Sequence, residues 1–79
     1  MSAVILQFPT QRVRAKAVAD AVRLAALRLG YHQHNADSAA AIARRDFVSG
    51  RYSAARAVSE MVGQLGAAMR QMRIKGGAA

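Results

Sequence analysis

Cysteine is absent from this chain of 79 residues, so neither a disulfide framework nor a thiolate metal site can stabilise it. Proline occurs once and aromatic residues make up only 5% of the sequence, which argues against a β-sandwich. Nowhere do about 18 uncharged apolar residues follow one another, so no membrane-spanning helix is predicted and no membrane partner is expected. The first residues carry no cation ahead of their short apolar stretch. We therefore expect no signal peptide and a cytoplasmic location.

Acidic residues are also scarce: four acids face twelve cations, which gives a net charge of +8. Such an imbalance predicts attraction to nucleic acid or to an acidic protein surface. Ten of the twelve cations are Arg, whose planar head suits bidentate contacts to carboxylate or phosphate. Each acid can serve as a helix cap or as an ion-pair partner within a helix: Asp20, Asp37, Asp46 and Glu60.

The sequence contains few residue patterns that are typical of an enzyme active site. No paired carboxylates, cysteine nucleophile or phosphate-cradling glycine loop is present, so we predict a protein that is not an enzyme and takes no small-molecule substrate or cofactor. His32 and His34, with Asp37 nearby, come closest to a metal site. A closed zinc site needs four ligands, so we interpret the two histidines as loop residues and predict no metal.

Alanine is the commonest residue, and it has the lowest cost in a helix. The predicted fold class is therefore all-α, a small three-helix bundle forming one domain over residues 1–79. A short extended arm over residues 1–9 contains the apolar segment Ala3–Phe8, which Pro9 closes. An arm of this kind leaves its backbone groups unpaired unless a partner strand or a groove receives it.

The helix boundaries follow from capping residues. The first helix is predicted over 11–29, with Thr10 as its N-cap and Gly30 after its last turn. A polar loop over 31–35 follows, and Asn35 or Asp37 caps a second helix that reaches about residue 48. A tight turn over 49–51 leads to a third helix, from residue 52 or 53 to about residue 74, and residues 75–79 are predicted to be a flexible tail.

The apolar residues of the third helix form one stripe at helical spacing, which we interpret mainly as core: Val58, Met61, Val62, Leu65, Met69 and Met72. An adaptable groove for a partner is the alternative interpretation. The first two helices carry apolar residues on more than one face, since Leu24, Leu27 and Ile42 lie away from the main apolar side. A monomeric bundle needs one apolar face per helix, so we expect a homodimer.

Gly50, Tyr52 and Ala55, preceded by Ile42 and Ala43, resemble the turn of a single tetratricopeptide hairpin. The resemblance extends over about residues 36–69, but the larger residues of that pattern and its closing proline are missing. It implies only a geometry, in which the second and third helices form an antiparallel hairpin.

Two groups of residues are candidates for contacting a macromolecule. On the third helix, Ser59, Gly63 and Gly66 form a shallow strip of small residues, and its cationic neighbours are Arg56, Arg70 and Arg73. Glycine inside a helix lowers stability by about 1 kcal/mol relative to alanine, so the presence of two glycines needs an explanation. Either another molecule approaches there, or the strip packs against the other helices, or the helix merely tolerates the two glycines. On the first helix the candidates share one face, which could equally be a solvated surface: Arg12, Lys16 and Arg23.

Two functions remain open. In the first, the protein is a small regulatory adaptor or inhibitor that docks through its basic helices on an acidic surface of a larger protein machine. Regulators that phages or mobile elements direct at a host nucleic-acid-handling complex belong to this class. In the second, it is a basic DNA-binding regulator that contacts phosphates as a dimer. The helix-turn-helix and ribbon-helix-helix patterns both fit poorly, so protein docking is the favoured hypothesis.

Overall fold

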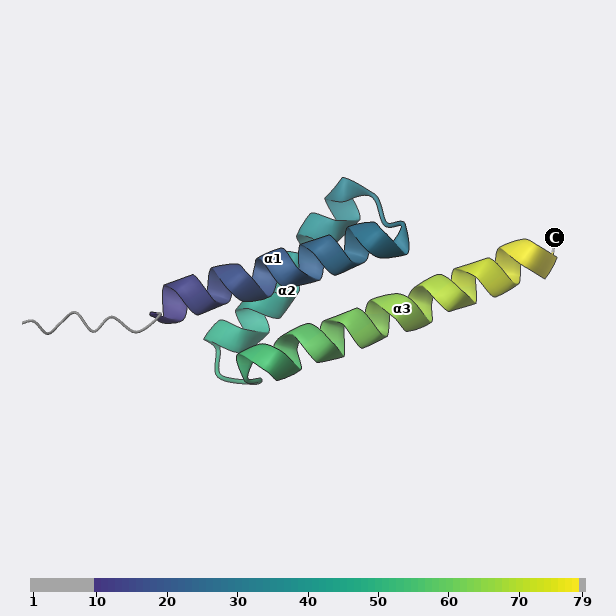
Figure 1. The fold of residues 1–79 in the computed structure, drawn as a ribbon. Coiled ribbons are helices and arrows are strands. Elements are labelled where there is room, and N and C mark those ends of the chain that lie inside the picture. Colours follow the sequence, from purple (N-terminus) through teal and green to yellow (C-terminus); the bar gives the residue numbers. More distant parts are fainter. Residues whose placement is uncertain (1–9, 79) are drawn as a thin grey trace, which may run out of the picture.

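The computed structural model describes residues 10–78, so the arm predicted for residues 1–9 lies outside the described part. Three helices account for almost all of it: α1 (Gln11–Leu29), α2 (Gln33–Val48) and α3 (Ala54–Ala78). No strand occurs between residues 10 and 78, and the predicted all-α three-helix bundle is confirmed (Figure 1).

Both ends of α1 lie where the capping residues predict them. The Thr10 hydroxyl accepts a hydrogen bond from the Val13 amide at 3.2 Å, which satisfies one of the free donors of the first turn. At the other end Gly30 takes a left-handed conformation with φ 102°, which costs glycine little. The Tyr31 amide then donates back to the Ala26 carbonyl at 3.0 Å, as in a Schellman motif.

The start of α2 differs from the prediction. The helix begins at Gln33 with His32 in the N-cap position, and the His32 side chain makes no capping hydrogen bond. The predicted caps, Asn35 and Asp37, both lie inside the helix, so that prediction was wrong. Asp37 is engaged elsewhere: its carboxylate accepts a 2.7 Å hydrogen bond from Arg23 on α1. The predicted polar loop is therefore shorter than its composition suggests.

The third helix begins close to the prediction and ends later. Ser53 caps it, since its hydroxyl accepts from the Arg56 amide at 3.2 Å, and the helix starts at Ala54. It ends at Ala78, about one turn beyond the predicted end at Ile74. The glycines of the predicted tail lower helix propensity, but none of residues 75–78 is a proline, which would remove a hydrogen bond and break the helix.

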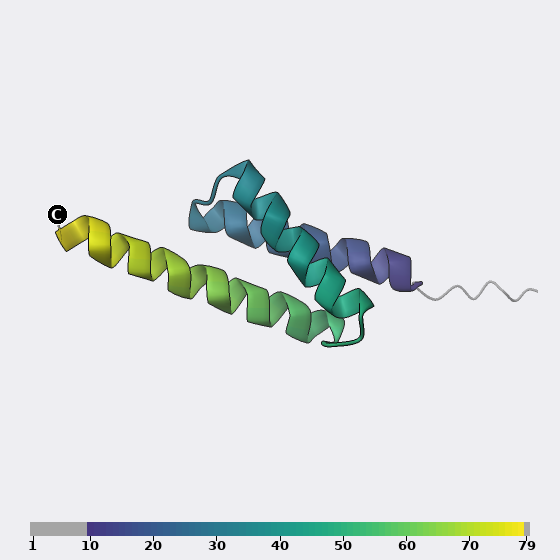
Figure 2. The same ribbon diagram turned by 180° about the vertical axis from the view of Figure 1, so that it is seen from behind.

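Packing is most extensive between α1 and α2, which cross at close range (Figures 1 and 2). α2 and α3 form the predicted hairpin around a short turn, in which Gly50 has φ 84°. The buried core is dominated by alanine, and Val22 is its largest fully buried side chain. Small side chains let the helices approach closely but bury little apolar surface. The buried residues are Ala15, Val18, Ala19, Val22, Ala26, Ala36, Ala39, Ala40, Ala43, Ala57 and Met61.

The apolar stripe of α3 belongs to this core only in part. Met61 is buried, Val58 and Leu65 pack against the core, and Met72 is 53% exposed. Both views show why: α3 runs on past the α1–α2 pair, and its last turns have no helix beside them (Figures 1 and 2). The prediction that the stripe is core is confirmed at Val58, Met61 and Leu65 and wrong at Met72.

Candidate docking surface

α1 and α3 together present one side of the molecule, on which α2 lies behind them (Figures 1 and 2). Helical spacing of three and four residues places two rows of side chains on this side. We call it the α1/α3 face. Its members from α1 are Arg14, Ala17, Ala21 and Arg28, and those from α3 are Ala55, Ser59, Gly63, Gly66, Arg70 and Arg73. All of them are exposed except Gly66, which is half-buried.

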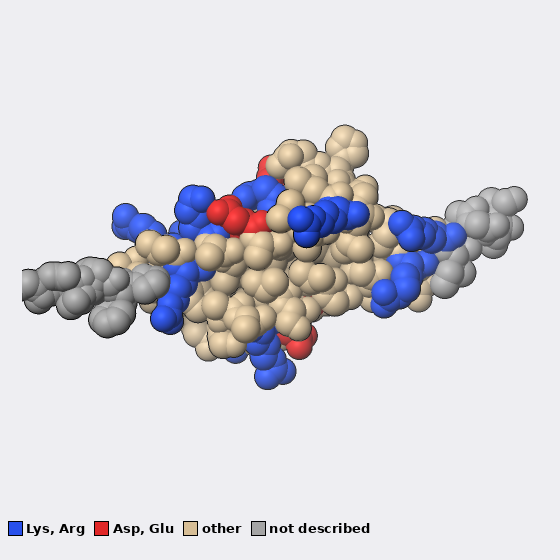
Figure 3. All heavy atoms as spheres, viewed as in Figure 1, with Lys and Arg blue, Asp and Glu red and all other residues tan. Residues whose placement is uncertain are grey.

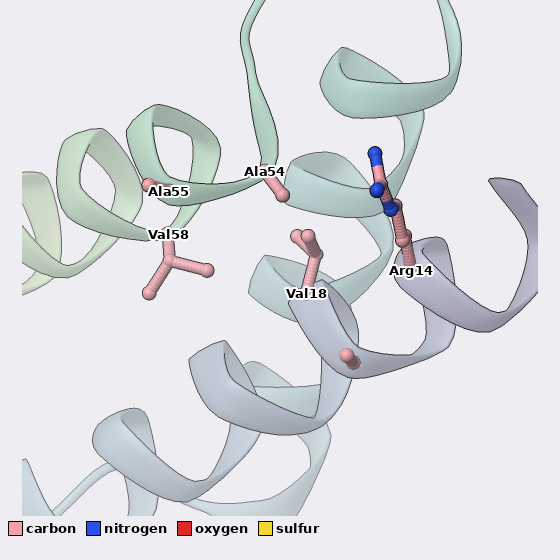
Figure 4. A pocket seen from close by; sticks show the side chains of 6 residues that line it. Arg14, Val18, Ala54, Ala55 and Val58 are labelled. Atoms are coloured by element: carbon pink, nitrogen blue, oxygen red, sulfur yellow. The ribbon is translucent and has the colours of Figure 1, made fainter. Parts of the chain in front are cut away.

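An open groove of about 320 Å³ lies between the two rows (Figure 4). Val18 of α1 and Val58 of α3 approach it from opposite sides, and Ala54 and Ala55 lie beside them. Arg14 is the only charged residue among those that line it. The groove is therefore an apolar depression with a cation at its edge.

The glycines of the predicted strip are not used for packing within the chain. A Cβ placed on Gly63 would meet nothing within 4 Å. A Cβ on Gly66 would touch only the Nη1 atom of Arg70, at 3.6 Å, which is ordinary contact with a flexible side chain. The interpretation in which this strip packs tightly against another helix is therefore wrong for the described residues. The strip is a flat, open part of the α1/α3 face.

Charges on this side of the molecule lie around the margin. Figure 3 shows an uncharged area across the middle, with blue Lys and Arg side chains around it and red carboxylates only at its upper and lower edges. Four arginines of the face form no ion pair with another described residue: Arg14, Arg28, Arg70 and Arg73. Their positive field is therefore directed at whatever approaches the uncharged middle.

Three of the cations predicted to contact a partner are already engaged within the chain. Lys16 pairs with Asp20 at 2.9 Å, and Arg56 lies 3.7 Å from Glu60. Arg23 makes the most contacts, to Asp20 at 3.0 Å and to Asp37 of α2 at 2.7 Å. Arg23 therefore joins α1 to α2, which is a structural role that its position in the sequence does not reveal.

The pKa values of these groups follow from the same contacts. The pKa of Asp37 is lowered, chiefly by the hydrogen bond from Arg23 and further by one from Gln33. The pKa of Asp20 is lowered chiefly by its hydrogen bond from Lys16. The pKa of Arg23 is raised, chiefly by its hydrogen bond to Asp37. Each shift favours the charged form, so the network stays ionised at neutral pH.

Arg12 lies outside the network. It is exposed on the first turn of α1, and no ion pair reaches it within residues 10–78. The predicted α1 group is thus divided: Arg12 is available, and Lys16 and Arg23 are paired. The predicted α3 group stays together on one face, apart from Arg56, whose guanidinium also lies 5.3 Å from the centre of the Tyr52 ring.

Sequence reasoning missed Arg14 and Arg28. The spacing of Arg14, Ala17, Ala21 and Arg28 along α1 is a signal that could have found them. The sequence alone does not indicate a binding surface at these positions, because alanine at the two middle positions, Ala17 and Ala21, is common on any helix. Only the placement of α3 beside this row gives it a groove and a second cationic edge.

Other parts of the described chain offer no stronger site. A second, polar hollow lies between α2 and α3, and its charged lining residues are Arg45, Asp46, Arg51 and Glu60. Within the described residues, no three histidine or acidic side chains gather where they could hold a metal ion. None of the described helices combines the length and the apolarity that a membrane crossing requires.

Compared with protein-family models, with curated proteins and with solved structures, the chain matches none of them. The fold and the surface define a class, a small basic three-helix bundle with an uncharged face bordered by arginines. The argument about function therefore depends on the geometry of that face.

Proposed function

We propose that this protein is a non-enzymatic adaptor or inhibitor whose α1/α3 face docks on an acidic surface of a larger protein. One observation carries the proposal: the face has an apolar groove at the first turns of α1 and α3 and an uncharged middle, and unpaired arginines stand at its margin. Protein interfaces have this anatomy, with an apolar centre and a polar rim. Arginine at the rim suits carboxylates on the partner.

The same arrangement favours a protein over a DNA duplex. Duplex binding depends on neutralising phosphates with many cations, and its affinity rises with their number. Of the cations predicted to touch phosphate, Lys16, Arg23 and Arg56 are paired with acids of the chain. Of the cations that remain, Arg70 and Arg73 border an area of small and apolar residues, which offers phosphate nothing to bind.

A second surface supports the proposal that the protein is a homodimer. Val13, Leu24 and Leu27 are 56%, 50% and 39% exposed on the side of α1 that faces away from the core. Apolar residues grouped along one side of a helix commonly mark an interface. We propose that two copies pair through this side of α1, whose member Leu24 lies between Ala21 and Arg28 and so borders the α1/α3 face.

Photo-crosslinking tests the docking proposal. A photoreactive residue at Gly63, where a side chain meets open space, should join the protein in its native cell to one discrete acidic partner. The same residue at Ala41, exposed on α2, is the matched control and should capture that partner poorly. Equal capture from both positions would show that the α1/α3 face is not the docking surface.

Titration of random-sequence duplex DNA by fluorescence anisotropy, at several salt concentrations, tests the alternative. Docking on protein predicts little binding near physiological salt. Tight binding whose logarithm falls steeply with the logarithm of salt concentration would instead favour the DNA-binding regulator. In that case Arg12→Ala should reduce the slope by about one, as expected for a lost phosphate contact.

A further inference from the structure

The end of α3 is a helix without a neighbour. The last contacts of the bundle along α3 fall at Leu65, whose carbonyl accepts a 2.6 Å hydrogen bond from the Tyr31 hydroxyl, and at Met69. Met69 lies beside the end of α1, since a Cβ placed on Gly30 would be 4.0 Å from its methyl group. Past this point α3 continues alone to Ala78 (Figures 1 and 2).

A segment of this kind needs another surface to stay helical. Isolated helices shorter than about 12–15 residues are marginal in water, and most helices are stabilised by packing an apolar face. The apolar stripe continues past Met69, which is half-buried beside the end of α1, to Met72, which is 53% exposed on the unsupported part. Methionine suits a contact with another protein, because its flexible side chain adapts to the shape it meets.

Charge decides what covers this stripe. Residues 61–79 contain Arg70, Arg73 and Lys75 and no acidic residue. A second copy lying along the stripe would bring the same cations, and like charges repel. Three of the four carboxylates of a second copy are already held by cations of their own chain: Asp20, Asp37 and Glu60. The fourth, Asp46, is half-buried near the end of α2, so a second copy could compensate these cations only poorly.

We propose that the last turns of α3, from Met69 onward, are a docking arm for an acidic amphipathic helix of the partner. The apolar side of that helix packs on Met69 and Met72, and its carboxylates meet Arg70 and Arg73. Helix-to-helix recognition by regularly spaced apolar anchors with charged flanks is a common way in which proteins bind helical segments. The inference rests on the proposed function, since it assigns the docking arm and the chemical class of the partner.

A synthetic amphipathic peptide with leucines three and four residues apart and glutamates on either side is the probe. Fluorescence anisotropy measures its binding to the full chain. We expect Met72→Ser to weaken binding about tenfold, because it removes an apolar anchor from the interface core. Gln71→Ser, on the same turn but away from the stripe, is the matched control and should bind as the wild type does. The same peptide with lysine in place of glutamate should not bind.

Two results would overturn the inference. One is equal peptide binding by the wild type and Met72→Ser, with both proteins shown to be helical by circular dichroism. The other is a dimer in sedimentation equilibrium that Met72→Ser dissociates, since the arm would then bind a second copy. A Gly63→Leu variant separates this inference from the proposed function. If Gly63→Leu weakens peptide binding and Met72→Ser does not, the α1/α3 face docks the partner and the arm does not.

The opposite result is that Met72→Ser weakens peptide binding and crosslinking from Gly63 captures no partner. This result would support the docking arm and contradict the docking role of the α1/α3 face.

Discussion

Asp37 holds α1 and α2 together from the outside of the bundle. Its carboxylate accepts from Arg23 of α1 at 2.7 Å and from Gln33, one turn earlier on α2, at 2.9 Å. Arg23 in turn reaches Asp20 on its own helix at 3.0 Å. Exposed ion pairs contribute little one by one, but a network fixes the geometry of its members. Here it links α2 to α1 beside the buried contacts between the two helices.

This network predicts an acid-dependent stability. Since the pKa values of Asp20 and Asp37 are lowered in the folded protein, their contribution is fully present above the ordinary carboxyl pKa of about 3.9. It is lost as the pH falls through the lowered values. Asp37→Asn should therefore be less stable than the wild type at pH 7, and its stability should fall less between pH 5 and pH 2. Urea unfolding at a series of pH values measures this.

Asp46→Asn is the control for that experiment, because the Asp46 carboxylate takes part in no ion pair within the described residues. It should keep the slope of the wild type. A wild-type slope in Asp37→Asn would show that the Arg23–Asp37 pair contributes nothing to stability.

At the level of elements, α3 serves two environments along its length. Its first half lies against the core through Met61, and its second half leaves the bundle at about Met69. One sequence stripe of constant spacing thus changes from core to exposed surface. The change comes from the lengths of the helices, since α1 ends at Leu29 and α3 continues to Ala78.

Two matched substitutions locate this change. Met61→Ala should destabilise the fold by about 2 kcal/mol or more, as expected for a buried methionine that leaves a cavity. Met72→Ala should change stability by less than about 0.5 kcal/mol, because its side chain is mostly exposed. Chemical denaturation of both variants checks the difference. A large loss in Met72→Ala would mean that the end of α3 packs on its own chain or on a second copy.

At the level of the whole molecule, the core is too thin to give a large stability. Its buried residues are mainly alanines, with Val22 as the largest fully buried side chain, and a chain of this size is marginal without further support. A net charge of +8 adds repulsion between cations. Disulfides cannot supply further support, because the chain has no cysteine, and association is the support that we propose.

Self-association is predicted to use the outer side of α1. Sedimentation equilibrium over a range of concentrations should show a dimer for the wild type and a monomer for Leu24→Glu, because a charge at a half-exposed apolar position would be buried without a partner. Ala41→Glu, on the exposed side of α2, is the control and should remain dimeric. A wild-type protein that is monomeric at every concentration would contradict the homodimer.

Local signals in the sequence determined the fold class and the ends of α1. Thr10 and Gly30 act within one turn of the helix they cap, so their effect is the same whatever surrounds them. The buried faces were also predictable, because helical spacing alone places Val18 with Val22 and Ala40 with Ala43. The small-residue strip at Gly63 and Gly66 could be found in the same way.

Tertiary structure decided what depends on neighbours distant in the sequence. The sequence suggests Asp37 as a helix cap, because an aspartate that caps a helix and an aspartate that forms an ion pair look the same in a sequence. Only the position of α1 shows that Asp37 pairs with Arg23. The groove between Val18 and Val58 exists only because two helices meet there. Whether Met72 is core or surface depends on where α1 ends. Each of these follows from contact across helices, and the periodicity of one helix carries no information about the length or position of another.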